Sequence, residues 1–153
     1  MSHEYEPADP EAYSAAHAML SSYLEHDVAA EEYIQAVEYD PELVRWYVRF
    51  GCDGRDAETI YFDLKARSLH YEVYFLPAPM QNHLEIYELL LRANRGAYAV
   101  SACLDRDGEV YLMGKTLLEH LDPAEIDRII GSTYQFTERW FPMIARLAFP
   151  KRG

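Results

Sequence analysis

The chain has 153 residues and a mass of 17.8 kDa, which suits one domain and is short for two. Half of its residues are hydrophobic, 14% are aromatic and 26% are charged, a composition that excludes a disordered or collagen-like protein. No apolar run approaches the roughly 20 residues of a membrane span, and the first residues lack the pattern of a signal peptide. The only two cysteines, Cys52 and Cys103, are far apart in the sequence, so we expect a reduced, cytoplasmic protein.

The net charge of −12 is spread along the chain, and the sequence contains no block of basic residues. A protein that follows a phosphate backbone needs a positive stripe, so nucleic acid and anionic membranes are not expected partners. The acidic surface predicts good solubility, and a preference for basic polypeptide segments is the alternative consequence.

The N-terminal third of the chain predicts one helix and one ambiguous segment. We expect residues 1–8 to form a flexible N-terminus and residues 9–153 to form a single domain. Asp9 followed by Pro10 is typical of a helix start, and the apolar spacing continues to about Glu25. Residues 28–38 are ambiguous, and a second short helix over Ala29–Val37 is the favoured interpretation.

Strand periodicity begins at Leu43. Apolar and polar residues alternate over residues 43–50, 60–64 and 69–75, and short turns separate the three segments. This pattern predicts three consecutive strands in an antiparallel meander.

The second half predicts a helix, two strands and a long helix. Asn82 and Glu85 stand three residues apart, as in a capping box, and open a helix that ends at Gly96. Strands over about 97–104 and 109–115 follow, and the first is apolar on both faces, so we expect it to be covered on both sides. Asp122 with Pro123 starts a final helix with one apolar stripe, and Pro142 lies opposite that stripe. The fold class is therefore α+β, a single antiparallel sheet of about five strands with helices packed on it.

Four segments carry a family resemblance: 82–85 (NHLE), 89–95 (LLLRANR), 104–112 (LDRDGEVYL) and 126–130 (IDRII). Together with the order of elements, they resemble the YbjN-domain family over roughly residues 43–149. The resemblance implies the fold of type III secretion chaperones, which are small, acidic, usually homodimeric proteins that bind extended client segments. Members of the family are described as regulators of sensory transduction and have no established activity.

Chemical motifs are weak throughout the sequence. Asp105, Asp107 and Glu109 begin like a calcium loop, but the glycine comes too early, so a hairpin turn is the better interpretation. His83 and Glu85 match only half of a zinc-deaminase signature. Cys103 lies in a strand that we expect to be buried. We therefore predict no catalytic residue, no metal site, no cofactor and no enzymatic activity.

The helix over residues 83–96 is apolar over more than half of its circumference. One face is formed by Ile86, Leu89, Leu90 and Ala93, and a second face is formed by Leu84, Tyr87 and Leu91. The second face either lies under neighbouring loops or makes a further contact, as a homodimer interface or a client groove. A separate set of tyrosines and basic residues on the early strands favours a solvated sheet face over an interface.

The sequence thus predicts a non-enzymatic homodimer that acts through protein–protein contacts with a client polypeptide or regulatory partner. The alternative function is a small-ligand sensor whose pocket lies between the sheet and the helices and whose occupancy modulates a partner. An unrecognised enzyme would require a cluster of perturbed titratable groups in a cleft.

Overall fold

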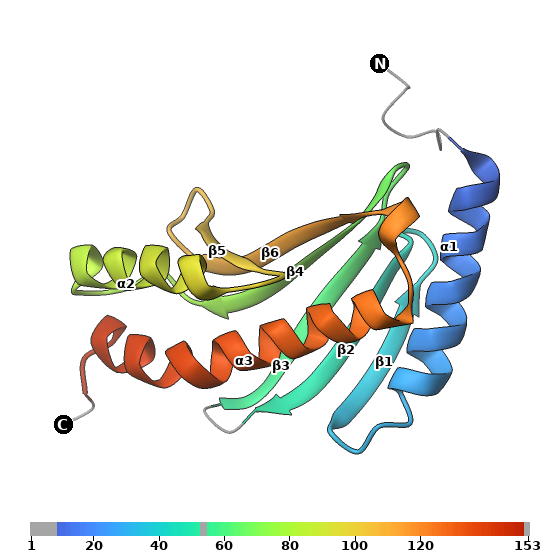
Figure 1. Cartoon of the computed structure of the whole chain (residues 1–153). Helices are drawn as coiled ribbons and strands as arrows, with labels where there is room; N and C mark the ends of the chain where they lie inside the picture. Colours follow the sequence, from blue (N-terminus) through green and yellow to red (C-terminus); the bar gives the residue numbers. More distant parts are fainter. Residues whose placement is uncertain (1–8, 53–54, 152–153) are drawn as a thin grey trace.

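The computed structural model describes residues 9–52 and 55–151 (Figure 1). Its centre is one antiparallel sheet of six strands in the order β1-β2-β3-β4-β6-β5. The strands are β1 (Ile34–Asp40), β2 (Arg45–Cys52), β3 (Arg55–Leu64), β4 (Ser68–Leu76), β5 (Ser101–Leu104) and β6 (Val110–Leu117). The helices are α1 (Pro10–Ser22), α2 (His83–Gly96) and α3 (Pro123–Ala148), with the π-helical turn η2 (Tyr23–Val28) and the 3-10 turn η3 (Leu118–His120). The predicted α+β class is confirmed, with one strand more than expected.

The hydrophobic core lies between the sheet and α3, which runs diagonally across it, while α1 lies next to β1 and α2 next to β5 (Figure 1). The alternation seen in the sequence is the reason for this arrangement. The apolar set of each strand of the meander is buried, and these residues are Trp46, Val48 and Phe50, then Ile60, Phe62 and Leu64, then Leu69, Tyr71, Val73 and Phe75. The opposite set points to the face without helices.

The two helices that were expected to begin after an aspartate, α1 and α3, do so. Asp9 accepts hydrogen bonds from the backbone N–H groups of Glu11 and Ala12, each at 3.1 Å. Asp122 accepts one from the N–H of Glu125 at 2.8 Å. Each aspartate satisfies donors that have no partner within the helix, which favours initiation at that residue.

The short helix expected over Ala29–Val37 is wrong, because its first part is a turn and β1 begins at Ile34. Val37 pairs with Val48 and Tyr39 pairs with Trp46 across the β1–β2 ladder. These inward residues alternate with Glu38, which is exposed. The period of two therefore starts one strand earlier than the sequence analysis placed it.

The strand that was expected to be covered on both sides is the edge strand β5. It begins at Ser101, and Tyr98 before it is 81% exposed. β6 lies between β5 and β4, so β5 has a strand neighbour on one side only. The sequence of this segment is apolar for a different reason. Ala99 and Val100, which come just before the strand, are buried in the core.

Two expectations fall on residues outside the described ranges, namely the flexible N-terminus at residues 1–8 and the centre of the turn at Asp53 and Gly54. Within the described residues, no helix is both long and apolar enough to cross a membrane.

Candidate functional site

The N-terminal end of α2 is attached to the C-terminal end of α3. The N–H of Met80 donates to the carbonyl of Ala148 at 2.9 Å, and the amide of Asn82 donates to the carbonyl of Leu147 at 2.8 Å. Asn82 has a left-handed backbone (φ 58°), and its side chain makes no capping hydrogen bond to α2. The capping interaction expected between Asn82 and Glu85 is therefore wrong, and the Asn82 side chain instead connects two helices.

The two apolar faces of α2 have different environments. Ile86, Leu90 and Ala93 are buried against the core, whereas Leu84 is 75% exposed and Leu91 is 70% exposed. Tyr87, which lies between the two leucines along the helix, is half-buried. Among the described residues no loop covers these two leucines, so this part of the second face is open to solvent.

An apolar groove of about 410 Å³ lies between α2 and the edge strand β5. Its lining residues are Tyr87, Leu90, Leu91, Asn94, Ala102, Cys103 and Leu104. Leu104, at the end of β5, is 46% exposed and continues the apolar surface from the helix to the strand. We call Leu84, Tyr87, Leu91, Leu104 and this groove the α2–β5 surface.

Asn94 holds the two elements of this surface together. Its side-chain N–H donates to the carbonyl of Ala102 at 3.1 Å, and its side-chain oxygen accepts from the N–H of Ala102 at 2.7 Å. These two bonds satisfy the N–H and the carbonyl of Ala102, as a neighbouring strand would do. The middle of this edge is therefore closed to an added strand, and the groove offers side chains for docking.

A side chain of β4 makes a hydrogen bond to the chain segment between α2 and β5. The hydroxyl of Tyr71 donates to the carbonyl of Ala99 at 2.6 Å, and burial raises the pKa of Tyr71. Gly114 makes this contact possible, because a side chain at that position would overlap the Tyr71 ring and the Ala99 carbonyl. Only glycine lets β6 pass this close to both groups.

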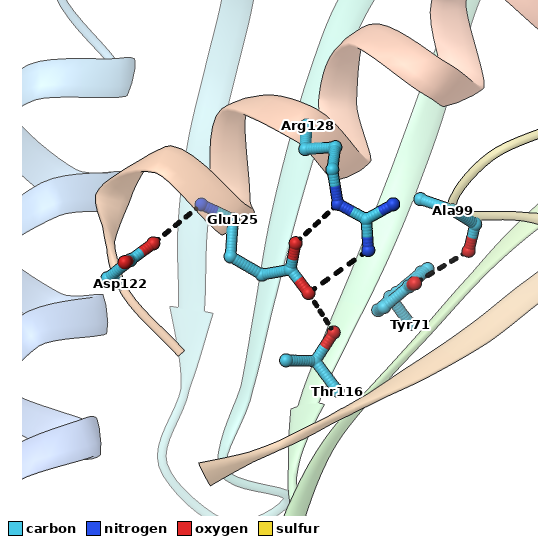
Figure 2. A network of polar contacts seen from close by, with 6 residues as sticks. All are labelled: Tyr71, Ala99, Thr116, Asp122, Glu125 and Arg128. Carbon is cyan, nitrogen blue, oxygen red and sulfur yellow. Dashed lines mark hydrogen bonds and ion pairs between the residues drawn. The ribbon is translucent and has the colours of Figure 1, made fainter. Parts of the chain in front are cut away.

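A polar network beside Tyr71 fixes the start of α3 on the sheet (Figure 2). Glu125 accepts hydrogen bonds from Arg128 at 2.6 and 3.2 Å and from the Thr116 hydroxyl at 2.7 Å. The bonds from Arg128 lower the pKa of Glu125 despite its partial burial. The helix that bounds the core is thus tied to β6 near its first turn.

The motifs weighed for chemistry have structural roles. Asp105 accepts hydrogen bonds from the N–H groups of Asp107 and Glu109, each at 2.9 Å, which forms the hairpin turn that the sequence analysis favoured. Across the described ranges, no group of three or more His, Cys, Asp or Glu side chains could hold a metal ion. Burial raises the pKa of the Cys103 thiol, and the acidic Glu72 and Asp105 raise it further, which disfavours a nucleophilic thiolate.

The sheet face without helices carries paired polar and aromatic side chains. Arg45 donates to Asp63 at 2.6 and 3.1 Å, and the rings of Tyr47 and Tyr61 pack edge to face with their centroids 5.1 Å apart. Cross-strand pairs of this kind stabilise a solvated sheet. The role of this face stays a prediction.

Leu104 and Asn94 complete the α2–β5 surface but were not singled out as site residues from the sequence. Leu104 is the last residue of a short strand whose position at the edge depends on the sheet order. Asn94 stands eight residues before its partner Ala102, a spacing with no helical or strand period. An asparagine near the end of a leucine-rich helix is the only local signal of its role.

Comparison with known proteins places the chain in a family and a fold. The YbjN family model, described as "Putative bacterial sensory transduction regulator", matches residues 28–146. The chain is 30% identical to an uncharacterised protein of Mycobacterium leprae over 130 residues, which cover 84% of this chain and 71% of that protein. It is 33% identical to an uncharacterised protein of Mycobacterium tuberculosis over 82 residues, which cover 54% of this chain and 45% of that protein.

Two solved structures share the fold at low sequence identity. The HopA1–SchA chaperone–effector complex contains a chain with a TM-score of 0.54 and 14% identity, covering 90% of this chain and 99% of that chain. The ExoU–SpcU complex of the type III secretion system of Pseudomonas aeruginosa contains a chain with a TM-score of 0.51 and 15% identity, covering 63% of this chain and 81% of that chain. The expected likeness to type III secretion chaperones is confirmed at the level of fold.

Proposed function

The chain belongs to the YbjN family, and from that premise we propose that it acts by protein–protein contact as a homodimer joined through the α2–β5 surface. The observation that carries the proposal is the pair of exposed leucines on α2, Leu84 and Leu91, beside an apolar groove at the sheet edge. One solved structure that shares the fold is a chaperone–effector complex and the other is a heterodimeric complex of a type III secretion system, which supports a role in binding polypeptides.

A second copy of α2 is the occupant that best fits this surface. Leu84, Tyr87 and Leu91 have the spacing i, i+3, i+7, which forms a single stripe along one helix face. A stripe of this kind is complementary to itself when two helices cross about a twofold axis near their midpoints. Tyr87 of one copy then packs near Leu91 of the other.

The charges on α2 favour an antiparallel pairing of the two copies. Glu85 and Glu88 lie in the N-terminal half of the helix, and Arg95 lies in its last turn. Antiparallel copies place the acidic half of one helix opposite the basic half of the other, whereas parallel copies place like charges together.

Burial of the exposed leucines supplies a large part of the binding free energy. Two leucines from each copy, at 75% and 70% exposure, are removed from water. At 1.5–3 kcal/mol for a fully buried leucine, the four side chains contribute about 4–9 kcal/mol before the entropic cost of association. Leu104 and Tyr87 add to this value, so a dimer at micromolar concentration is reasonable.

The test is the solution mass of the protein and of the double variant Leu84→Asp/Leu91→Asp. We expect the wild-type mass to be twice 17.8 kDa by native mass spectrometry or light scattering, and the variant to be a monomer with unchanged circular dichroism. The control is Leu43→Asp/Leu117→Asp, which makes the same change at exposed leucines outside the surface and should stay dimeric. A monomeric wild type, or a double variant that remains a dimer, would contradict the proposed interface.

Loss of folding in the double variant would give the two leucines a different role. If Leu84→Asp/Leu91→Asp loses its folded structure while the control keeps it, Leu84 and Leu91 stabilise the domain itself and the proposal fails.

A non-catalytic role is part of this proposal. A catalytic carboxyl group is expected to have a perturbed pKa and to lie in a cleft. Glu58 has the largest rise in pKa of any carboxyl group among the described residues, but it is buried against α3 and does not line the α2–β5 groove.

The alternative function is a small-ligand sensor. A second cavity, on the other side of α2, supports this alternative.

A further inference from the structure

A cavity of about 300 Å³ lies between the C-terminal half of α2 and the middle of α3. Its floor is apolar, because Ala93 and Phe136 line it and are 3% and 4% exposed. Polar side chains from both helices stand around this floor, including Ser132 and Gln135 from α3. The volume matches the lower end of the range for small-molecule sites in proteins.

Two arginines line this cavity in a protein that has a net charge of −12. Arg92 comes from α2 and Arg139 comes from α3. Within residues 9–52 and 55–151, neither guanidinium has a carboxylate at ion-pair distance. A guanidinium carries a fork of N–H donors that matches a carboxylate or phosphate group, so the cavity has a positive charge that no carboxylate of the described residues pairs with.

A favourable interaction with the helix dipole explains the position of Arg92 but not that of Arg139. Arg92 lies near the C-terminal end of α2, where a cation interacts favourably with the helix dipole. Arg139 lies far from both ends of α3, which runs from Pro123 to Ala148. Its guanidinium instead lies 5.0 Å from the centre of the Trp140 ring, a contact that holds it at the cavity.

Aromatic side chains provide flat walls beside this positive charge. Trp140 is half-buried, and Tyr98, which is 81% exposed, stands at the rim between α2 and β5. Exposed tyrosine and tryptophan side chains are suited to stacking on a planar ring.

We propose that this α2–α3 cavity binds a small organic anion, with its carboxylate or phosphate group between Arg92 and Arg139 and its planar ring against Trp140 and Tyr98. A long polyanion does not fit the surroundings, because two arginines in an acidic protein do not form the extended positive stripe that nucleic acid needs. The site is separate from the α2–β5 surface, since the two cavities have no lining residue in common.

Nuclear magnetic resonance of the two tryptophan indole N–H groups tests the proposal directly. Trp46 is fully buried in the core and serves as an internal reference, whereas Trp140 lines the cavity. Adenosine monophosphate, indole-3-acetate and inorganic phosphate are the three probes, each titrated to about 5 mM, where a site with a dissociation constant of about 1 mM is mostly occupied. We expect the two ring-bearing probes to shift the Trp140 signal in a saturable way and to leave the Trp46 signal in place.

The variant Arg139→Gln should weaken binding of both ring-bearing probes about tenfold, as loss of one charged hydrogen bond predicts. Arg146→Gln removes the same charge from an exposed position of the same helix outside the cavity and should bind as the wild type does. No shift of Trp140 with any probe, or equal binding by Arg139→Gln and wild type, would refute the site. A full response to inorganic phosphate alone would refute the role of the aromatic walls.

Binding of the probes at the α2–α3 cavity does not depend on the proposed dimer. The variant Leu84→Asp/Leu91→Asp changes the α2–β5 surface and leaves every lining residue of the α2–α3 cavity in place. We expect it to bind the probes like the wild type, so failure of the dimer proposal and failure of the ligand site are separate outcomes.

Discussion

Glu58 is a buried acidic residue at the centre of the fold, and its ionisation should control stability. The side chain lies on the core side of β3 and is 3% exposed. Both of its oxygens lie within hydrogen-bond distance of the Thr137 hydroxyl on α3, at 2.8 and 2.7 Å. A hydroxyl donates only one hydrogen, so a protonated carboxyl group that donates in return satisfies both contacts.

Burial is the main cause of the altered acidity of Glu58 and raises its pKa from 4.5 to about 7. The Thr137 hydrogen bond and Arg55, whose guanidinium lies 3.6 Å from a Glu58 oxygen, oppose this rise, while the negative charge of Glu138 adds to it. The free-energy cost of desolvating the charged carboxylate exceeds the stabilisation that one hydroxyl and one arginine provide.

The sign of the effect on stability follows from proton uptake. Between pH 4.5 and about 7 the folded chain keeps the Glu58 proton that the unfolded chain has lost, so the free energy of unfolding falls as the pH rises. Below this range both states carry the proton, and above it neither does, so the contribution becomes constant. The whole change amounts to about 3 kcal/mol.

The variant Glu58→Gln keeps the shape of the protonated side chain and cannot ionise. Urea unfolding of both proteins between about pH 4.5 and pH 8 should show the variant gaining about 3 kcal/mol relative to the wild type. The matched change Glu32→Gln, at an exposed position before β1 and away from α2, should stay within about 0.5 kcal/mol of the wild type at every pH. A difference between Glu58→Gln and wild type that does not depend on pH would refute the reasoning.

Three further substitutions test contacts that shape the fold, each by urea unfolding. Asn94→Ala removes both hydrogen bonds to Ala102 and should cost about 1–3 kcal/mol; a loss below about 0.5 kcal/mol would mean that water replaces the side chain fully. Gly114→Ala should cost about 2 kcal/mol or more, because its methyl group overlaps the Tyr71 ring, and a neutral result would contradict the close approach of β6. Asp122→Ala removes the N-cap of α3 and should cost about 1 kcal/mol, whereas Asp122→Asn should keep most of that stability.

Local features of the sequence correctly predicted much of this protein. Asp9 and Asp122 begin helices because a capping side chain and its N–H partners are only two or three residues apart. The alternation in β2, β3 and β4 identified the buried face because side chains of a strand point to opposite sides in turn. The exposed leucines of α2 were likewise visible as a second apolar stripe on a helix that needs only one.

Other features depend on contacts between distant residues and were settled by the tertiary structure. Periodicity does not show which strand lies at an edge, so the exposure of β5 depends on β6 pairing with β4. Glu58 and Thr137 are 79 residues apart, and Arg92 and Arg139 meet at one cavity only because α2 packs beside α3. A sequence encodes caps and periods within a few residues, whereas polar partners and cavities arise from the order in which elements pack.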